Sequence, residues 1–453
     1  MGSAPEEVDL VVVGSGQGGV PLAATLAGAG ERVVLFERGA FGGTCINVGC
    51  TPSKTLLAAA HAAGRARSAG TLGVHADVRV DQRAVFSRVR ELRSRWSAAV
   101  ERRLTDAGVD VVRAQAAFVG VRTLAGGGRT VRGRRVVIDT GGAAAVPALP
   151  GLAGSPYWTN ANFFDQLELP RRLLVLGGGY IGLELGQGAQ RLGSAVTIVH
   201  AGAEVLDREE RDAAAGVRGA LEADGVRVLL GARAESVAWA GGVFRLQLAG
   251  GDAVEGEGLL VATGRTLNTA GLAPEASGIE LAKSGAVAVN EYLESTCPGV
   301  FALGDVAGQF AFTHVSWEDH RRLLSTFAGR PRKRDDRVLS YTTFTEPQLA
   351  RTGFSEAQAR AAGIDARTVT LPLSSVARAV EWDLERGFFR LVVDAASDRI
   401  IGATFLGYEA GELIHVIVAH IEAGSTWQVL DRSMHIHPTL AEGLPSLARL
   451  LAG

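Results

Sequence analysis

Two cysteines separated by four residues, Cys45 and Cys50, have the spacing in this sequence that most directly indicates chemistry. The chain has 3 cysteines in 453 residues, so the pair does not belong to the kind of disulfide framework that holds small secreted domains together. A disulfide across so short a loop constrains the unfolded chain little, and strained or exposed disulfides are the readily reduced ones. We therefore interpret the pair as a redox-active disulfide, with two unrelated buried thiols as the alternative.

The elements that would position this pair begin with an apolar strand, a glycine turn and a helix, predicted in succession over residues 8–29. Gly14 permits the tight turn, Gly16 lets the backbone approach a pyrophosphate, and Gly19 lets the helix pack on the strand. A second strand follows and ends in Glu37, where an acid can hydrogen-bond a ribose hydroxyl. This pattern predicts a dinucleotide site directly before the cysteine pair.

The same pattern occurs a second time over residues 173–199, with Gly177, Gly179 and Gly182 in the turn. Two such units predict two bound dinucleotides. A later apolar strand ends in Asp305, at the edge where the ligands of parallel sheets collect. A simple turn-forming role is the alternative for this acid.

Two helices are expected between residues 53 and 104, where Trp96 is predicted to be a core or helix-packing residue. From about residue 336 the pattern changes, which predicts a third domain. Its strands and helix are expected over 341–344, 388–393, 400–406 and 409–423. Near the end, His437 precedes a proline and Glu442 follows five residues later, a spacing that can orient an imidazole for proton transfer. A surface histidine is the alternative.

Length and charge limit the class of protein. A chain of 453 residues predicts about two to four domains. Lys plus Arg number 46 and Asp plus Glu 48, so neither nucleic acid nor a membrane is expected as a partner, and the arginine-rich patches 129–135 and 330–337 are expected to be solvated loops. Residues 1–9 lack the pattern of a secretion signal and no apolar run reaches membrane-spanning length, so we expect a cytoplasmic protein.

In this order the motifs resemble those of the class I pyridine nucleotide-disulfide oxidoreductases, the flavin-dependent family of dihydrolipoamide dehydrogenase, glutathione reductase and mercuric reductase. The resemblance covers essentially the whole chain and rests on residues 14–19, 42–54, 177–182, 262–265, 301–305 and 437–442. It implies an α/β fold with two Rossmann-like domains, which bind FAD and NAD(P), and a C-terminal α+β dimerisation domain. The implied boundaries are 1–145 and 269–335 for the two parts of the FAD-binding domain, 146–268 for the NAD(P)-binding domain and 336–453 for the dimerisation domain.

The resemblance also implies how the site would work. NAD(P)H would deliver a hydride to the flavin past a gating aromatic, Tyr180, and Lys54 and Glu184 would form an ion pair beside flavin N5. Cys50 would face the flavin as the charge-transfer thiolate, and Cys45 would attack the substrate. The implied cofactor-binding residues are Gly14, Gly16, Gly19, Glu37, Gly43, Thr44, Lys54, Gly177, Gly179, Tyr180, Gly182, His200, Gly264, Gly304, Asp305 and His314.

The base implied by the resemblance is His437, steadied by Glu442, and in the family it comes from the other subunit. A homodimer with the C-terminal third as its interface is therefore implied, with a small disulfide or dithiol as substrate and no metal site. The third cysteine, Cys297, has no partner in sequence and is expected to be structural or incidental.

Departures from the family pattern bear on substrate and coenzyme. Mercuric reductases typically have a C-terminal cysteine pair and a tyrosine in the tail, whereas this chain keeps His437. Residues 312–319, however, resemble the mercuric-reductase-like branch, so an oxidant, quinone or metal-ion reductase is an alternative. A dehydrogenase component of a multienzyme complex, or a flavoprotein redox sensor, is an alternative of another class. Asp207 would repel a 2′-phosphate whereas His200 or Arg208 would attract one, and NADH is slightly favoured over NADPH.

Overall fold

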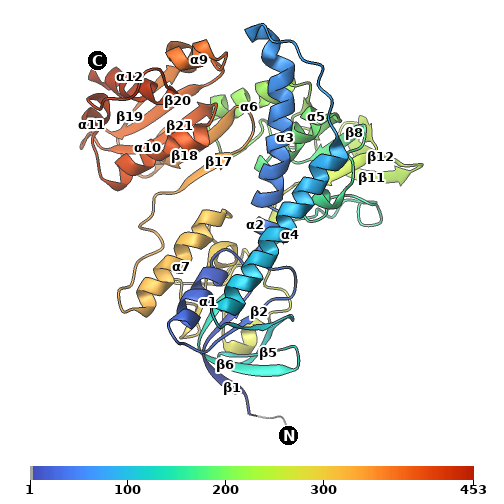
Figure 1. Ribbon diagram of the computed structural model, residues 1–453, viewed down its shortest axis with the longest axis vertical. Helices are drawn as coiled ribbons and strands as arrows, with labels where there is room; N and C mark the ends of the chain where they lie inside the picture. The colour runs from blue at the N-terminus through green and yellow to red at the C-terminus, as the bar shows by residue number, and fades with distance from the viewer. Residues whose placement is uncertain (1–3) are drawn as a thin grey trace.

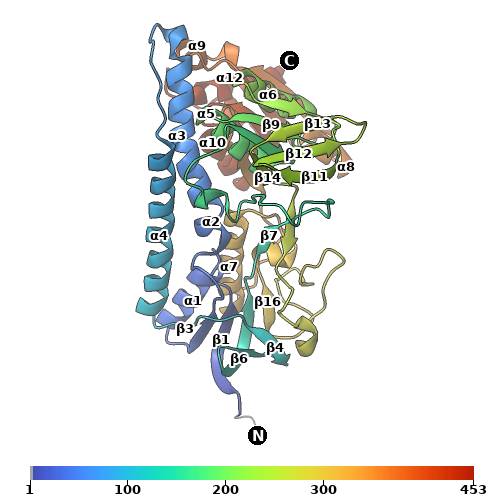
Figure 2. The same cartoon turned by 90° about the vertical axis from the view of Figure 1, so that its right-hand side faces the viewer.

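In the computed structural model, which describes residues 4–453, three units of sheet and helix pack together. The N-terminal unit lies at one end of the molecule, and the second and third units lie together at the other end (Figures 1 and 2). Two long helices, α3 (Cys50–Ser68) and α4 (Gln82–Asp106), lie side by side and run from the first unit toward the other two.

The first unit is built on a seven-stranded sheet in the order β3-β2-β1-β6-β5-β4, with β16 beside β6. Its strands are β1 (Glu6–Val13), β2 (Val33–Phe36), β3 (Asp110–Val112), β4 (Ala117–Gly120), β5 (Thr123–Gly126), β6 (Arg129–Ile138) and β16 (Val300–Ala302). The last residues of the central parallel strands are continuously apolar, because helices or loops cover both faces of the sheet. The register aligns Val13 with Phe36 and with Ile138. The residues that follow these three strands therefore meet at one edge of the sheet.

Helices α1 (Gly19–Gly28) and α7 (Thr313–Phe327) pack on this sheet together with the C-terminal end of α4, and α1 contacts α7. After β6 the chain leaves through β7 (Gly142–Ala144), which pairs with the returning strand β15 (Arg265–Leu267). The first unit is therefore made from two separate parts of the chain. The predicted residue boundaries of the domains stay predictions.

The second unit repeats the arrangement in smaller form. Its parallel sheet has the order β10-β9-β8-β14, with α5 (Tyr180–Arg191) and α6 (Arg211–Ala223) packed on it and an antiparallel sheet, β11-β12-β13, beside it. The strands are β8 (Arg172–Leu176), β9 (Ala195–Val199), β10 (Arg227–Leu229), β11 (Ala234–Ala240), β12 (Val243–Leu248), β13 (Ala253–Gly256) and β14 (Gly258–Val261). Leu176 is aligned with Val199 and with Val261, so a second set of strand ends meets at one edge.

The third unit is an antiparallel five-stranded sheet in the order β17-β18-β21-β20-β19. Its strands are β17 (Ser340–Thr343), β18 (Gln348–Gly353), β19 (Ala366–Pro372), β20 (Phe388–Asp394) and β21 (Ile400–Gly407), and its helices are α8 (Glu356–Ala361), α9 (Ala377–Glu381), α10 (Ala410–Glu422), α11 (Trp427–Asp431) and α12 (Gly443–Arg449). An apolar core joins the sheet to α10, α11 and α12. The predicted strands and helix of this unit are confirmed to within a residue or two, whereas β18 and β19 were not predicted.

Two local predictions are wrong. Residues 129–135 form the first part of strand β6, because their arginines alternate with buried residues and pair with acids on neighbouring segments. Trp96 is 52% exposed in this chain, since it lies on the outward side of α4. Among residues 4–453, no helix is long and apolar enough to cross a membrane. The prediction that residues 1–9 are not a secretion signal falls in part on residues 1–3, which lie outside the described residues.

Candidate functional site

The cysteine pair lies where two helices meet. Cys45 is in the short helix α2 (Gly43–Asn47), and Cys50 is the first residue of α3. Gly42 and Gly43 have φ angles of 97° and 59°, a backbone conformation that residues with a Cβ rarely adopt, so the chain turns sharply just before Cys45. Both cysteines are free thiols here, which is the reduced state of such a pair, and each affects the acidity of the other.

The two thiols differ in acidity. The pKa of Cys50 is lowered to about 6, mainly by its interaction with the Cys45 thiol and then by the Thr313 hydroxyl and the Lys54 charge, although partial desolvation opposes these effects. The same interaction with Cys50, together with burial, raises the pKa of Cys45. Thr313 is the first residue of α7, and its Oγ1 lies 3.1 Å from Cys50 Sγ. At neutral pH the reduced pair therefore holds its negative charge on Cys50.

One helical turn after Cys50, Lys54 forms an ion pair with α5. Its Nζ lies 2.7 Å from Glu184 Oε2 and 4.4 Å from the centroid of the Phe344 ring. The other oxygen of the buried Glu184 accepts the Phe344 N–H at 2.9 Å. Because a buried carboxylate without a partner is costly, these contacts fix α3 to α5 and to the segment after β17. The pair implied by the resemblance is thus formed.

The first glycine turn forms a cradle that accepts no side chain. A Cβ at Gly14 would lie 2.3 Å from the carbonyl oxygen of Asp139. Glu37 accepts hydrogen bonds from Ser15 N at 2.8 Å and from Ser15 Oγ at 2.7 Å, which ties the end of β2 to the turn. A cavity of about 170 Å³ lies here, and its lining includes Gly14, Gly16, Glu37, Gly43 and Thr44. A backbone that a ligand can approach closely, the N terminus of α1 and an acid at the ribose position together fit the ADP half of FAD.

The strand that returns to the first sheet brings Gly304 and Asp305 to the same edge. Gly304, with φ of 65°, donates its N–H to Asp319 Oδ2 at 2.8 Å. Asp305 Oδ2 lies 3.2 Å from Arg265 Nη2, and the same nitrogen donates to the carbonyl of Gly142 at 2.9 Å. Arg265 therefore partly neutralises Asp305 and joins it to the two strands that cross between units.

The second glycine turn repeats the cradle. A Cβ at Gly177 would lie 2.3 Å from Ala262 O, and one at Gly182 would lie 2.1 Å from Gly177 O. Gly264, with φ of 141°, also requires glycine. A Cβ at Gly179 would have no described atom within 4 Å, so only a close ligand would demand glycine there. The turn therefore fits a second dinucleotide at the N terminus of α5.

His200 follows β9 and packs against this second turn. Its Nδ1 accepts the N–H of Gly178 at 3.2 Å, so the ring proton is on Nε2, which lies 3.1 Å from Asp207 Oδ1 and 3.0 Å from the carbonyl of Glu204. Arg208 is exposed next to Asp207. Both ring nitrogens of His200, which was predicted to attract a 2′-phosphate, are thus already hydrogen-bonded within the protein.

An aromatic cluster connects the three units near the cysteine pair. Tyr180, the first residue of α5, lies 6.0 Å from Phe312 between ring centroids. Phe312 stacks with Tyr341 at 5.1 Å and with His314 at 5.5 Å between ring centroids. His314 donates from Nε2 to the carbonyl of Ser340 at 2.6 Å, so its side chain is directed toward the third unit. Its predicted contact with FAD stays a prediction.

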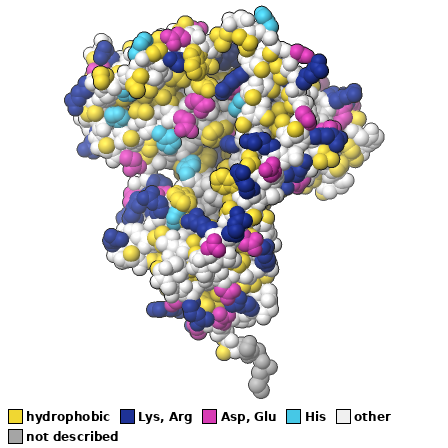
Figure 3. Space-filling model, viewed as in Figure 1, with side chains coloured by type: hydrophobic (Ala, Val, Ile, Leu, Met, Phe, Trp, Pro, Cys, Tyr) yellow, Lys and Arg dark blue, Asp and Glu magenta, His cyan; other side chains and the backbone are white. Residues whose placement is uncertain are grey.

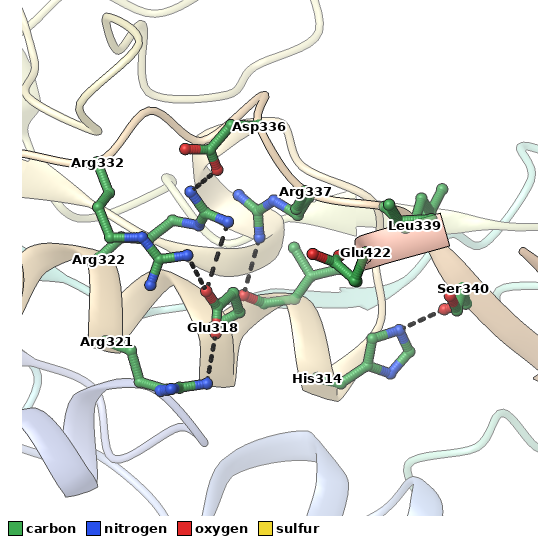
Figure 4. A pocket seen from close by; sticks show the side chains of 12 residues that line it. His314, Glu318, Arg321, Arg322, Arg332, Asp336, Arg337, Leu339, Ser340 and Glu422 are labelled. Carbon is green, nitrogen blue, oxygen red and sulfur yellow. Dashed lines mark hydrogen bonds and ion pairs between the residues drawn. The ribbon is translucent and has the colours of Figure 1, made fainter. Parts of the chain in front are cut away.

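His314 also lines a cavity of about 300 Å³ between α7 and the segment before β17, where charged side chains converge on Glu318 (Figure 4). Glu318 pairs with Arg321 and Arg332, each at 3.1 Å. The arginines of this cavity are therefore paired with acids. On the surface beside α7, Lys or Arg side chains and His side chains lie together (Figure 3). Patch 330–337 is a loop, as predicted, but several of its charges form ion pairs.

His437 and Glu442 form the predicted pair at the surface of the third unit. His437 Nδ1 lies 2.6 Å from Glu442 Oε2, and the imidazole is 73% exposed. The neighbouring Met434 and Ile436 are 98% and 78% exposed, although both are apolar. Large exposed apolar side chains mark interaction surfaces. Cys297, in contrast, is buried in the core of the first unit near Ser277, consistent with a structural part.

Comparison with known proteins identifies the family of this chain. Residues 8–319 match the family described as Pyridine nucleotide-disulphide oxidoreductase, and residues 339–448 match the dimerisation domain of the same family. The chain is a class I pyridine nucleotide-disulphide oxidoreductase. Members of this family are FAD flavoproteins that use NAD(P) and a redox-active disulfide, and the dimerisation domain implies a homodimer. The fold class expected from the resemblance is confirmed.

Relatives of this oxidoreductase that carry different names are about equally similar to it. A mercuric reductase from Acidithiobacillus ferrooxidans is 35% identical, covering 98% of this chain and 82% of the relative. The probable pyridine nucleotide-disulfide oxidoreductase RclA of Escherichia coli is 34% identical, covering 97% and 98%. A dihydrolipoyl dehydrogenase from Thermus scotoductus is 34% identical, covering 98% and 97%. The solved structure of HOCl-induced flavoprotein disulfide reductase RclA from Escherichia coli has a TM-score of 0.89 at 33% identity, covering 98% and 100%.

Sequence reasoning missed two residues of this site, Thr313 and Asp139. Thr313 contacts Cys50 across 263 positions of the chain, and Asp139 contacts Gly19 across 120. A partial signal existed for Asp139, because it directly follows an apolar strand, but its place beside the glycine turn depends on the order of the strands. Thr313 gave no comparable signal, since its place depends on the packing of α7.

Proposed function

We propose that this flavoprotein passes electrons from NAD(P)H through FAD and the Cys45–Cys50 pair to a small disulfide or a similar small oxidant, or runs the reverse reaction with a dithiol. The observation that carries the proposal is the cysteine pair at the junction of α2 and α3. Thr313 contacts Cys50, and one helical turn after Cys50, Lys54 is paired with Glu184. The bound flavin supplies hydride acceptance from the nicotinamide and electron transfer to the disulfide.

Different acidities support different roles for the two sulfurs. Only a thiolate is a competent nucleophile or charge-transfer donor. Cys50, whose pKa is lowered to about 6, is assigned the side of the flavin. Cys45, whose pKa is raised by its interaction with Cys50 and by burial, is assigned the substrate side and needs a base to take its proton.

His437 is proposed to be that base in the site of the other subunit. Its contact with Glu442 orients the imidazole, and its exposure leaves Nε2 free to meet another chain. The exposed Met434 and Ile436 on the same segment would be covered by the partner in the homodimer. Each subunit would then complete the site of the other.

NADH is proposed to be the slightly better coenzyme. Asp207 lies on the segment that follows β9, where a 2′-phosphate would be read, and its carboxylate would repel that group. His200 accepts the Gly178 N–H at Nδ1, so this nitrogen is not available to donate to a 2′-phosphate. The comparison of kcat/KM for NADH and NADPH tests this preference.

A second candidate function, reduction of a metal ion, quinone or other oxidant, is supported by the relatives. Mercuric reductases are as similar in sequence as the other relatives, and one solved structure of Escherichia coli RclA is a Cu(II) complex. Such an acceptor could take electrons directly from the flavin without Cys45. A function of a different class, as the dehydrogenase component of a multienzyme complex, is also proposed as an alternative. Size-exclusion chromatography of a lysate tests it, because such a component would elute with a large assembly and not as a dimer.

An anaerobic titration of the purified yellow protein tests the main proposal. NADH and then NADPH are added while the long-wavelength absorbance of a thiolate beside flavin is followed, and the reduced protein is then offered a panel of disulfides. Appearance of the band, and its loss on addition of one of the disulfides, supports the proposal. Failure to form the band would remove the role given to Cys50.

A further inference from the structure

Asp139 is a buried acid directly beneath the first glycine turn. It follows β6, and the sheet register places it beside Gly14, where its N–H donates to Val13 O at 2.8 Å. Its Oδ2 accepts the N–H of Gly19 at 2.6 Å, and a Cβ at Gly16 would lie 2.5 Å from the same oxygen. Asp139 is 6% exposed and lines the cavity that fits the ADP half of FAD.

Three other acids act on Asp139 through their charges. They are Glu37 at the end of β2, Asp305 in the turn after β16 and Asp319 in α7. Asp305 is paired with Arg265 and Asp319 with Arg337, so those two acids have cations of their own. Among the described residues, the side chain of Asp139 has one hydrogen-bond donor, the Gly19 N–H, and no cation in contact.

Burial raises the pKa of Asp139 well above its ordinary value. The Gly19 N–H opposes this effect, and the charges of Asp305, Glu37 and Asp319 add to it. A diphosphate bound at the N terminus of α1 would add further negative charge on the same side of the sheet. An ionised Asp139 and a bound diphosphate are therefore mutually unfavourable.

We propose that Asp139 couples FAD binding to proton uptake: the carboxyl is protonated in the FAD-bound protein, and its ionisation in the free protein weakens FAD binding. Asp139 is in this view a positioning residue whose neutral form caps Gly19 without repelling the diphosphate. The proposal rests on FAD binding by the family fold and not on the identity of the electron acceptor.

The sign of the pH dependence follows from linkage. Bound FAD disfavours the carboxylate, so it raises the pKa of Asp139 above that of the free protein. Between the two pKa values, binding takes up a proton and the dissociation constant rises with pH, by at most about tenfold per pH unit for one group. Below both values the carboxyl is neutral in either state, and the dissociation constant is then independent of this group.

The test measures FAD binding to the apoprotein by quenching of flavin fluorescence from about pH 5 to about pH 9, in the wild type and in Asp139→Asn. The wild-type dissociation constant should rise at least about tenfold across this range, and that of Asp139→Asn less than about threefold, because the amide keeps an oxygen for Gly19 but cannot ionise. Asp139→Ala, which also cannot ionise, should be equally flat, and a weaker affinity at low pH would report the lost cap on Gly19. Equal slopes in the wild type and both variants would overturn the proposal.

Calorimetry of the wild type alone gives a second test that does not depend on the folding of a variant. FAD is titrated into the apoprotein in buffers of different ionisation enthalpy, at several values across the same pH range. A tenfold change in the dissociation constant corresponds to a pKa difference of about one unit, so uptake should reach at least about half a proton at some pH in this range. Absence of uptake throughout contradicts the proposal. Neither experiment involves turnover, so a wrong assignment of the electron acceptor would leave both results unchanged.

Discussion

Replacing Thr313 by valine tests whether the side chain in contact with Cys50 sets the acidity of that thiol. Valine has nearly the shape of threonine but lacks the hydroxyl whose oxygen lies 3.1 Å from Cys50 Sγ. A hydrogen bond to a charged group contributes about 1.5 to 3 kcal/mol, and the lower end applies because Cys50 is exposed in the single chain and solvent screens it. At about 1.4 kcal/mol per pKa unit, the pKa of Cys50 should rise by about one unit.

The assay for this prediction is a pH titration of the reduced holoenzyme, followed through the long-wavelength absorbance of the Cys50 thiolate beside the flavin. The thiolate is present above the pKa of about 6 in the wild type, and Thr313→Val should move the midpoint upward by about one pH unit. Thr313→Ser keeps the hydroxyl and should leave the midpoint near that of the wild type. An unchanged midpoint in the valine variant would show that this hydroxyl does not stabilise the thiolate.

Three further substitutions test other parts of the site. Lys54→Met leaves Glu184 buried without a cation. Because the lysine is partly exposed, the free energy of unfolding of the apoprotein should fall by about 2 to 3 kcal/mol in urea denaturation, and Lys54→Arg should lose less. A fall below about 1 kcal/mol in Lys54→Met would contradict the importance of the pair. His437→Gln should lower disulfide turnover about 10²- to 10⁴-fold without slowing the reduction of the flavin by NAD(P)H in a single turnover. Glu442→Gln should have a smaller effect of the same kind. An equal loss in flavin reduction and in disulfide turnover would argue that His437 is not the base for Cys45. His200→Arg should raise kcat/KM for NADPH relative to NADH by about tenfold, and no change would remove the segment after β9 from coenzyme selection.

The two glycine turns could be predicted from sequence because each depends on residues close together in the chain. A continuous apolar run ends at Gly14 or Gly177, and only glycine fits the backbone where a Cβ would touch the neighbouring strand. The contact of His437 with Glu442 was predictable for the same reason, since five positions separate the two residues. Local spacing and steric demand were enough in each case.

Features that depend on packing between distant segments could not be predicted. The cap of Asp139 on Gly19 follows from the order of strands in the sheet, which the apolar runs alone do not specify. Trp96 has helical spacing with apolar neighbours, but spacing identifies a helix face and not what covers that face. Strand β18 mixes Gln348 and Arg351 with apolar residues, and the buried Arg351 is compensated by Glu209 from another unit, a partner that the sequence does not reveal.

The most direct test of the proposed electron path is the turnover of Cys45→Ser with a disulfide and with a quinone, measured on the purified holoenzyme. Serine cannot attack a disulfide, whereas the flavin and Cys50 remain. We predict that disulfide turnover is lost, that NAD(P)H still reduces the flavin, and that the oxidised variant shows the long-wavelength band of the unpaired Cys50 thiolate. Retention of disulfide turnover by Cys45→Ser would contradict the assignment of Cys45 as the residue that meets the substrate.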